Sequence, residues 1–579
     1  MNAFPAESDI NKALELLIDY YKVPDSIIKG LFGKENYRKL NTIMADLGEK
    51  GINTRELARV LIIEKGAYLF SGSSKEVRAL REHLIRQLPE DKLMDLYARN
   101  PDSKRNITSS AYMIRPLVQK KWVVGGTWPR DFTAALGFPV IFSGISIPKT
   151  SSTDPVMDIE ARKKVPPLAP FQQKLKEKML QVLNQEAEKT RCVVTLPTGG
   201  GKTRLAVESF IEWMQGPFSE GKYMLWIAQS EELCEQAISC ISDMWQEKEF
   251  PESLRVYRYF AGKSIGEEQL IGGAVVASIQ QLYTRLQKGD KVIEEIIKNC
   301  GAMIIDEAHH ALAPVYSTLL EKAEELCGPD LFPICGLTAT PGRSDGETTS
   351  LVNRFQAYLI EPELPETSSY KANPLQYFRE KGYLAKPVHH IYETGRDYVV
   401  KEDDVEPMQN DLTPEFLETL ANDEVRNRRI IERLLEISRG KQTLVYACTV
   451  KHAEFLSTVL NAAGRKAASI SANTPKATRR MYLDAFKKGE IEFLLNYGVL
   501  TTGFDAPKTE YIMICRPTTS VLLYEQIVGR GLRGPRFGGT EHCTIIDFAD
   551  NLLRLGKPLA YQRFHNFWEK GSAETAVLS

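Results

Sequence analysis

The pattern of apolar positions divides the chain into two parts of different character. Up to about residue 145, apolar residues recur three and four positions apart, as in Ile10, Leu14, Leu17 and Ile18. That spacing places them on one face of a helix. Glycines and prolines separate the segments that carry it. The pattern predicts a mostly helical domain over residues 1–145.

From residue 168 onwards, short apolar runs alternate with stretches of helical spacing. Such runs are typical of parallel strands buried on both faces, and the intervening helices complete an α/β pattern. The runs fall into two sets, and each set predicts one parallel sheet. The first set is Cys192–Leu196, Met224–Ala228, Ala274–Ala277, Ala302–Ile305 and Cys335–Leu337. The second set is Thr443–Tyr446, Phe493–Leu495, Tyr511–Cys515 and Thr544–Ile546.

The intervals between these regions give the expected domain boundaries. Residues 146–167 are rich in Pro, Ser and Thr and lack apolar periodicity, which predicts a linker. We expect one α/β domain over residues 168–345 and a second over residues 426–555. Residues 346–425 contain scattered prolines and an acidic stretch, so we interpret them as a segment that bridges the two domains or is inserted between them. Residues 556–579 would form a C-terminal tail.

Composition narrows the class of protein. The 579 residues are 43% apolar and 26% charged, an ordinary globular composition that excludes collagen-like and wholly disordered chains. No apolar run approaches the roughly 18 residues that a membrane span requires. The first 25 residues lack a signal-peptide pattern. The nine cysteines are scattered without a Cys-x-x-Cys pair, which favours reduced thiols in the cytoplasm over disulfides or a zinc site.

Charge is balanced over the chain but not evenly spread. The 74 basic residues face 75 acidic ones, so a uniformly basic nucleic-acid binder is excluded. Residues 1–150 hold 23 basic residues against 17 acidic ones. There, Lys120-Lys121-Trp122 and Trp128-Pro129-Arg130 mix basic and aromatic residues, which suits base stacking beside phosphate contacts. Alternatively, the tryptophans belong to the core, and this domain could equally bind a partner protein or fold back as an inhibitor.

The clearest chemical signal is a glycine-rich loop between a predicted strand and a predicted helix. It reads Leu196-Pro197-Thr198-Gly199-Gly200-Gly201-Lys202-Thr203. Glycines let backbone N–H groups surround phosphate oxygens, and the N-terminus of the following helix adds a favourable dipole. Lys202 would neutralise the β- and γ-phosphates, and the Thr203 hydroxyl would ligate Mg²⁺. Pro197 to Thr203 are therefore predicted to bind ATP, although Leu196 stands where the usual pattern has its first glycine.

Two further signals supply the remaining parts of a phosphoryl-transfer site. An apolar strand ends in two carboxylates, of which Asp306 is placed to hold Mg²⁺ and Glu307 to polarise the attacking water. Later in the chain stands Gln526-Ile527-Val528-Gly529-Arg530-Gly531-Leu532-Arg533. Arg530 and Arg533 are three positions apart, which predicts that they project from one helix face. Their guanidinium groups could reach across a cleft to the transferring phosphoryl group.

In their order along the chain, these segments resemble the motifs of superfamily 2 helicases. Leu196–Thr203 matches motif I, Asp306-Glu307-Ala308-His309 motif II, Thr338-Ala339-Thr340-Pro341 motif III, Thr501-Thr502-Gly503-Phe504-Asp505 motif V, and Gln526–Arg533 motif VI. The ordered set spans roughly residues 168–555. The DEAH form of motif II, together with Arg516-Pro517-Thr518, is most similar to RadD-like DNA helicases and to the translocase parts of restriction enzymes. The resemblance implies two tandem RecA-like parallel-sheet domains, preceded by the helical domain.

The resemblance also implies roles for further residues. Gln172 would read the adenine base, and Gly503 and Asp505 would lie at the ATP cleft. Coupling between the nucleotide and the nucleic acid would pass through His309, Thr338, Thr340 and Gln526. Contacts to the sugar–phosphate chain would come from Gln229, Ser278, Gln280, Thr449, Thr501 and Thr502. Each of these side chains could instead be an ordinary helix cap, turn hydroxyl or structural group.

The expected function is therefore that of an ATP- and Mg²⁺-dependent DNA helicase or translocase, in DNA repair or phage defence. The preference for single-stranded or branched DNA over RNA rests on the subfamily resemblance alone. Two alternatives stay open. One is a nucleic-acid-gated ATPase that signals without unwinding, and the other is the motor subunit of a restriction or phage-defence complex. A protein partner could dock on residues 1–145, and no membrane association is expected.

Overall fold

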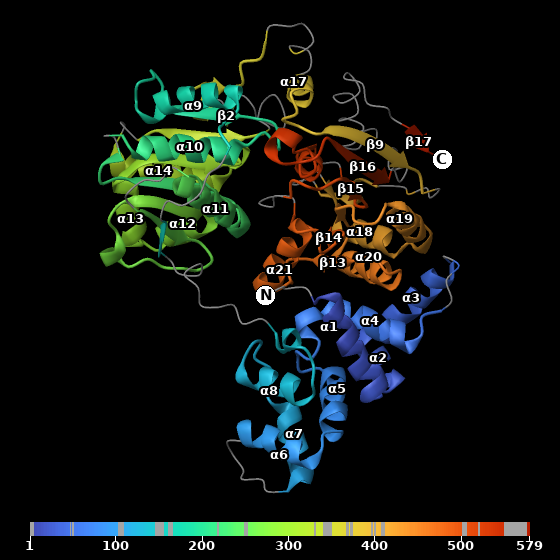
Figure 1. The fold of residues 1–579 in the computed structure, drawn as a ribbon. Coiled ribbons are helices and arrows are strands. Elements are labelled where there is room, and N and C mark those ends of the chain that lie inside the picture. The colour runs from blue at the N-terminus through green and yellow to red at the C-terminus, as the bar shows by residue number, and fades with distance from the viewer. Residues whose placement is uncertain are drawn as a thin grey trace.

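Three bodies follow one another along the chain: a helical domain, a first α/β lobe and a second α/β lobe (Figure 1). The structure is a computed structural model. It describes residues 5–46, 48, 51–101, 109–144, 156–159, 166–216, 219–247, 253–328, 332–339, 350–351, 353–365, 370, 374–394, 398, 401–406, 411–500, 506–518, 521–548 and 576–578.

The amino-terminal domain is built from helices, as its apolar spacing predicts. They are α1 (Glu7–Leu14), α2 (Asp25–Phe32), α3 (Lys34–Asp46), α4 (Thr54–Lys65), α5 (Lys75–Arg86), α6 (Glu90–Arg99), α7 (Ser110–Gln119) and α8 (Thr127–Ala135). The rings of Phe70, Trp122 and Phe132 contact one another at centroid distances of 5.2 to 6.1 Å. Trp122 and Trp128 are only 9% and 4% exposed. Both tryptophans therefore belong to the core of this domain, which is the second of the two interpretations given for them.

The first lobe is a parallel sheet with a core on each face. Its strand order is β1-β4-β5-β3-β6-β7-β2-β8, and every described neighbouring pair is parallel except β1 with β4. The strands are β1 (Val156–Ile159), β2 (Arg191–Thr195), β3 (Tyr223–Ala228), β4 (Leu254–Tyr259), β5 (Gly273–Ser278), β6 (Cys300–Asp306), β7 (Ile334–Thr338) and β8 (Leu359–Ile360). The helices are α9 (Pro170–Leu183), α10 (Lys202–Met214), α11 (Glu231–Glu247), α12 (Ile279–Gln287), α13 (Lys291–Lys298) and α14 (Pro314–Cys327).

Alternation along the central strand β3 shows why its sequence is apolar throughout. Met224 and Trp226 enter one buried cluster, whereas Leu225 and Ile227 enter another on the opposite face. Successive strand residues point to opposite faces, so a strand covered on both sides needs an unbroken apolar run. Part of the predicted linker also joins this lobe, because β1 pairs antiparallel with the edge strand β4.

The second lobe is also a parallel sheet, with the order β13-β14-β12-β15-β16-β9-β17. The strands are β9 (Lys386–Tyr392), β12 (Thr443–Tyr446), β13 (Ala467–Ile470), β14 (Phe493–Asn496), β15 (Tyr511–Ile514), β16 (His542–Phe548) and β17 (Ala576–Leu578). The helices are α18 (Pro414–Asn422), α19 (Glu424–Glu436), α20 (Val450–Ala462), α21 (Lys476–Lys487) and α22 (Val521–Val528). A hairpin, β10 (Val405–Glu406) with β11 (Asp411–Leu412), and the helix α17 (Pro374–Glu380) lie in the segment between the two lobes along the chain. The two sheets are tandem RecA-like domains, as the sequence predicts.

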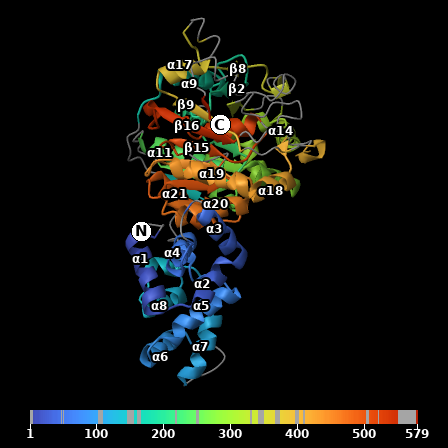
Figure 2. The same ribbon diagram turned by 90° about the vertical axis from the view of Figure 1, so that its right-hand side faces the viewer.

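The helical domain packs against the second lobe. One continuous hydrophobic cluster contains core residues of both bodies, and Figure 2 shows α3 and α4 directly beneath α20. At this contact Thr458 of α20 donates a hydrogen bond to the buried carboxylate of Glu64 in α4. Tyr482 of α21 is 7% exposed and lies beside Gly66, just beyond α4. The helical domain and the second lobe therefore form one packed body.

Candidate active site

The glycine-rich loop lies between the end of β2 and the start of α10. Gly199 and Gly201 both have a φ of +84°, in the left-handed region that side chains rarely adopt. A Cβ on Gly200 would lie 2.9 Å from the carbonyl oxygen of Pro197, and a Cβ on Gly201 would lie 2.5 Å from the side-chain nitrogen of Gln172. These positions therefore require glycine, because a side chain would strain the backbone or collide with a neighbouring atom. With Lys202 as the first residue of α10, the loop fits a phosphate group at a helix N-terminus.

Gln172 links this loop to the start of α9 through hydrogen bonds. It is 1% exposed, and its side-chain nitrogen donates to the Gly200 carbonyl oxygen at 2.9 Å. Its side-chain oxygen accepts from the Ala169 N–H at 2.9 Å, at the start of α9. Both ends of the amide thus contact backbone in this structure. A contact between Gln172 and adenine stays a prediction.

The two carboxylates of motif II lie at the carboxyl end of β6. Asp306 is 3% exposed, and burial together with the negative charge of Glu307 raises its pKa to about 7, against the opposing effects of Lys202 and Arg530. The Glu307 N–H donates to Asp306 Oδ1 at 3.0 Å. A buried carboxylate that is costly to ionise is a good ligand for a cation, because the cation restores the charged form. The donor set, Asp306 with the Thr203 hydroxyl, fits the oxygen preference of Mg²⁺.

His309 connects motif II to motif III. Its Nδ1 lies 3.1 Å from the hydroxyl oxygen of Thr338 and 3.4 Å from Oε2 of Glu307. Thr338 is the last residue of β7 and is fully buried. Glu307 itself has a φ of 51°, an uncommon value for a residue with a side chain. The two motifs therefore share one hydrogen-bonded unit, and a coupling role for His309 and Thr338 stays a prediction.

Motif VI approaches this site from the second lobe, but not as predicted. The helix α22 ends at Val528, so Arg530 lies in the following turn. Arg533 lies in extended backbone that bridges antiparallel to Leu384. The two arginines therefore do not share a helix face, because Gly529 and Gly531 interrupt the helix between them. The positive charge of Arg530 nevertheless lowers the pKa of Asp306, which places it near motif II.

The turn after α22 contacts the glycine-rich loop directly. A Cβ on Gly529 would lie 2.6 Å from the Cβ of Thr198 in the first lobe. Glu525, next to Gln526 on α22, is a residue that the sequence reasoning missed. Burial raises its pKa to about 7, and the charges of Lys202 and Glu307 both act on it. Its position one helical turn before Gly529 is the feature of the sequence that could have identified it.

The described candidates for nucleic-acid contact lie where strands meet helices. Gln229 follows β3, Ser278 ends β5 and caps α12, and Gln280 is exposed on α12. Thr449 caps α20 in the second lobe, where its hydroxyl oxygen accepts from the His452 N–H at 3.1 Å. The predicted residues Thr340, Thr501, Thr502, Gly503 and Asp505 lie outside the described residues.

An ion pair joins the two lobes near these positions. Arg479 of α21 and Glu232 of α11 lie 2.5 Å apart, and the arginine side chain is 13% exposed. The Arg479 guanidinium also donates to the Ser471 carbonyl oxygen at 2.9 Å. The structure thus directs Arg479 toward the first lobe.

Two sequence profiles match the chain, one on each lobe. The profile described as "Type III restriction enzyme, res subunit" matches residues 166–343, and the profile described as "Helicase conserved C-terminal domain" matches residues 426–534. The first contains motifs I and II, and the second contains motif VI. The chain belongs to the superfamily 2 helicases.

Curated relatives match between 59% and 67% of this chain. The Saccharomyces cerevisiae protein IRC3, whose name describes an ATP-dependent helicase, is 29% identical over 62% of this chain and 48% of its own length. The irc3 protein of Schizosaccharomyces pombe, named as a mitochondrial ATP-dependent helicase, is 27% identical over 67% of this chain and 58% of its own length. The endonuclease subunit of the type I restriction enzyme EcoKI from Escherichia coli K12 is 23% identical over 59% of this chain and 31% of its own length.

The chain thus spans between a third and three fifths of the length of these relatives. Among solved structures, Saccharomyces cerevisiae Dbp5 bound to RNA and ADP BeF3 is 13% identical, with a TM-score of 0.48 over 71% of this chain and 94% of that chain. Within the described part of the chain, no helix combines the length and apolar composition that a bilayer span needs.

Proposed function

We propose that this chain is an ATP-dependent DNA translocase or helicase, in which hydrolysis between the lobes drives movement along a strand. The observation that carries the proposal is the meeting of the two lobes at one site. Arg530 of the second lobe acts electrostatically on Asp306 of the first, and the Gly529 turn lies on the Thr198 loop. A site completed only when two bodies meet can couple its chemistry to their relative movement.

Different residues of this chain have different roles in ATP hydrolysis. Lys202 and the loop N–H groups hold the phosphates, and Asp306 and Thr203 would hold Mg²⁺, which would neutralise phosphate charge when bound. Glu307 orients a water molecule and accepts its proton. Arg530 and Arg533 stabilise the negative charge that develops on the transferred phosphoryl group. His309 and Thr338 couple the nucleotide state of this site to the residues that contact the nucleic-acid strand.

The proposed nucleic acid runs over both lobes. Gln229, Ser278 and Gln280 offer polar groups on the first lobe, and Thr449 offers a helix N-terminus on the second. Contacts of this type reach phosphates and sugars and give position without sequence preference. DNA is proposed over RNA because the profile on the first lobe is that of a restriction-enzyme subunit, and EcoKI contains a related subunit.

Displacement of a third strand from a DNA triplex tests translocation directly, because it requires movement along the duplex but no strand separation. We expect the wild-type protein to displace the third strand with ATP, and Glu307→Gln to bind DNA without displacing it. If DNA stimulates ATP hydrolysis while neither a triplex strand nor a forked duplex is displaced, the protein is a nucleic-acid-gated sensor and the motor proposal is wrong.

The similarity to a restriction-enzyme subunit favours one second candidate, a motor subunit that works with other chains. Such a subunit would translocate on duplex DNA but leave cleavage to a partner. Triplex displacement by the purified chain, with no cleavage of the duplex and no unwinding of a fork, would favour this candidate over an independent helicase.

A further inference from the structure

The segment of residues 382–389, which leads into and forms the first half of β9, contacts motif VI on its C-terminal side. The Ala385 N–H donates to the Leu532 carbonyl oxygen at 2.9 Å, and the Gly534 N–H donates to the Tyr383 carbonyl oxygen at 3.0 Å. The Arg536 N–H donates to the Gly382 carbonyl oxygen at 3.0 Å. These backbone hydrogen bonds enclose Arg533 and fix the chain immediately after the motif VI turn.

The same segment contacts motif VI on its N-terminal side through one histidine. His389 of β9 is 8% exposed, and its Nε2 lies 3.1 Å from the hydroxyl oxygen of Tyr524 on α22. Tyr524 lies five residues before Gly529, where the motif VI turn begins, and is 3% exposed. The His389–Tyr524 contact therefore fixes the helix that carries Gln526, on the other side of Arg530 from the backbone hydrogen bonds.

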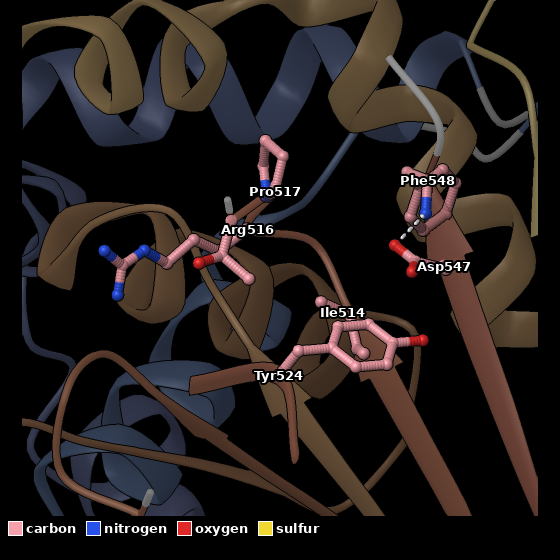
Figure 3. A pocket seen from close by; sticks show the side chains of 7 residues that line it. Ile514, Arg516, Pro517, Tyr524, Asp547 and Phe548 are labelled. Atoms are coloured by element: carbon pink, nitrogen blue, oxygen red, sulfur yellow. Dashed lines mark hydrogen bonds between the residues drawn. The ribbon is translucent and has the colours of Figure 1, made fainter. Parts of the chain in front are cut away.

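A buried carboxylate lies beside this histidine. Asp547 of β16 is 3% exposed, and its Oδ2 lies 3.9 Å from the Nε2 of His389. Asp547 Oδ1 accepts from the Phe548 N–H at 2.9 Å, while Oδ2 has no hydrogen-bond partner among the described residues. Asp547 and Tyr524 line a cavity of about 10 Å³, shown in Figure 3, which is room for about one water molecule. Such a water could bridge the carboxylate to its neighbours.

The segment also reaches the nucleotide-binding loop of the first lobe. The ring of Tyr383 packs edge-on against Phe171 at a centroid distance of 4.9 Å. A side-chain methyl of Leu384 lies 3.4 Å from the position that a Cβ on Gly199 would take. Residues 382–389 therefore contact the glycine-rich loop, the start of α9 and both sides of motif VI.

We propose that residues 382–389, fixed by the His389–Tyr524 contact, position Arg530 and Arg533 over the nucleotide-binding loop. This inference rests on the proposed ATPase function and assigns His389 as a positioning residue, with Asp547 as the group that orients it. Loss of the contact leaves phosphate binding by Lys202 intact but loosens the arginines. Groups that act mainly in the transition state change kcat and leave KM nearly constant.

The test compares His389→Ala with His389→Gln, which can still hydrogen-bond to Tyr524, and with His390→Ala as the matched control. His390 is the next residue of β9 and therefore points to the opposite face of the sheet. We expect His389→Ala to lower kcat for ATP by about ten-fold to a hundred-fold with little change in KM. We expect His389→Gln to recover most of the loss and His390→Ala to resemble wild type. An unchanged kcat in His389→Ala, or an equal loss in His390→Ala, would overturn the inference.

Hydrogen–deuterium exchange gives a second readout that does not depend on activity. Peptides covering residues 521–536 should exchange faster in His389→Ala than in wild type, because the Gly534 and Arg536 N–H groups are bonded to the segment. Peptides from the first lobe should not change. Unaltered exchange over residues 521–536 contradicts the inference even if the protein proves to have no ATPase activity. Absence of hydrolysis in wild type, equal to that of Lys202→Ala, contradicts the proposed function instead.

Discussion

Gly529→Ala tests whether the two lobes meet at the nucleotide-binding loop as the structure shows. Gly529 follows α22, and its φ is not in the left-handed region, so alanine can adopt its backbone conformation, although the Cβ would lie 2.9 Å from the Glu525 carbonyl oxygen. The added Cβ would lie 2.6 Å from the Cβ of Thr198 and would overlap its methyl group. Aliphatic carbons pack at roughly 3.5–4.0 Å. The Thr198 methyl carbon would be nearer still, so the motif VI turn must retreat from the loop by more than about 1 Å to restore that separation.

A retreat of this size moves Arg530 away from the phosphates while leaving the first lobe intact. Misplacement of a catalytic group by about 1 Å can cost on the order of a hundred-fold in rate. We expect kcat for ATP in the presence of DNA to fall by about that factor, with KM nearly unchanged. The melting temperature should stay close to that of wild type, because the overlap lies between lobes and can be relieved by their separation.

Steady-state ATPase assays with two further variants make the test specific. Gly126→Ala is the matched control: a Cβ there would lie 2.9 Å from a local carbonyl oxygen, the same distance as at Gly529, but in the helical domain. Thr198→Ser removes the overlapping methyl and should restore part of the activity of Gly529→Ala in the double variant. The proposed contact between the lobes is wrong if the kcat of Gly529→Ala stays within about two-fold of wild type, or if the kcat of Gly126→Ala falls by as much as that of Gly529→Ala.

Three further predictions address the chemistry, the domain contact and the aromatic core. Glu307→Gln should lower ATP hydrolysis by about 10²- to 10⁴-fold without weakening nucleotide binding, measured by single-turnover kinetics; near-normal turnover would remove Glu307 from its assigned role. Burial raises the pKa of Glu64 to about 7, so the folded state holds this proton more tightly than the unfolded state does. The free energy of unfolding should therefore decline as the pH rises from 5 toward 8. Glu64→Gln should remove that decline in thermal unfolding, and an unchanged pH profile in the variant would contradict this assignment. Trp122→Ala should destabilise the helical domain by about 3–5 kcal/mol in denaturant unfolding, whereas weaker DNA binding with unchanged stability would favour the stacking interpretation.

Much of the fold could be predicted because buried parallel strands leave an unambiguous pattern. Each of the nine apolar runs coincides with a strand, and the strand limits differ from the runs by no more than two residues. The strands that escaped prediction carry polar or short sequences. Lys386–Tyr392 contains two histidines and a proline, so its sequence alone predicts a loop. Its pairing with β16 makes it a strand.

The linker shows a second limit of sequence patterns. Residues 156–159 lie in a stretch without helical or strand periodicity, yet they add an antiparallel strand to the edge of the first lobe. Edge pairing uses backbone hydrogen bonds and needs little from side chains. The packing of the helical domain on α20 was likewise beyond prediction, because a helix face that is apolar in sequence does not identify the surface that covers it.

Within the candidate site, the sequence predicted which residues lie there more accurately than it predicted how those residues are arranged. The loop around Lys202 and the carboxylates at the end of β6 stand where the strand and helix pattern put them. The spacing of Arg530 and Arg533 was misleading, because it assumed a helix that the glycines end at Val528. His389 and Leu384 could not be assigned at all, since their contacts with motif VI join positions more than a hundred residues apart in the chain.

The central claim is that nucleic acid controls ATP hydrolysis at the Lys202 site. The most direct measurement is the steady-state ATPase rate of wild type and Lys202→Ala with no nucleic acid, single-stranded DNA, duplex DNA, forked DNA and RNA. We expect one form of DNA to stimulate the wild-type rate well above the basal rate, RNA to stimulate it less, and Lys202→Ala to remain inactive in every case. Stimulation by RNA alone would contradict the DNA assignment, and equal rates for wild type and Lys202→Ala would contradict the claim itself.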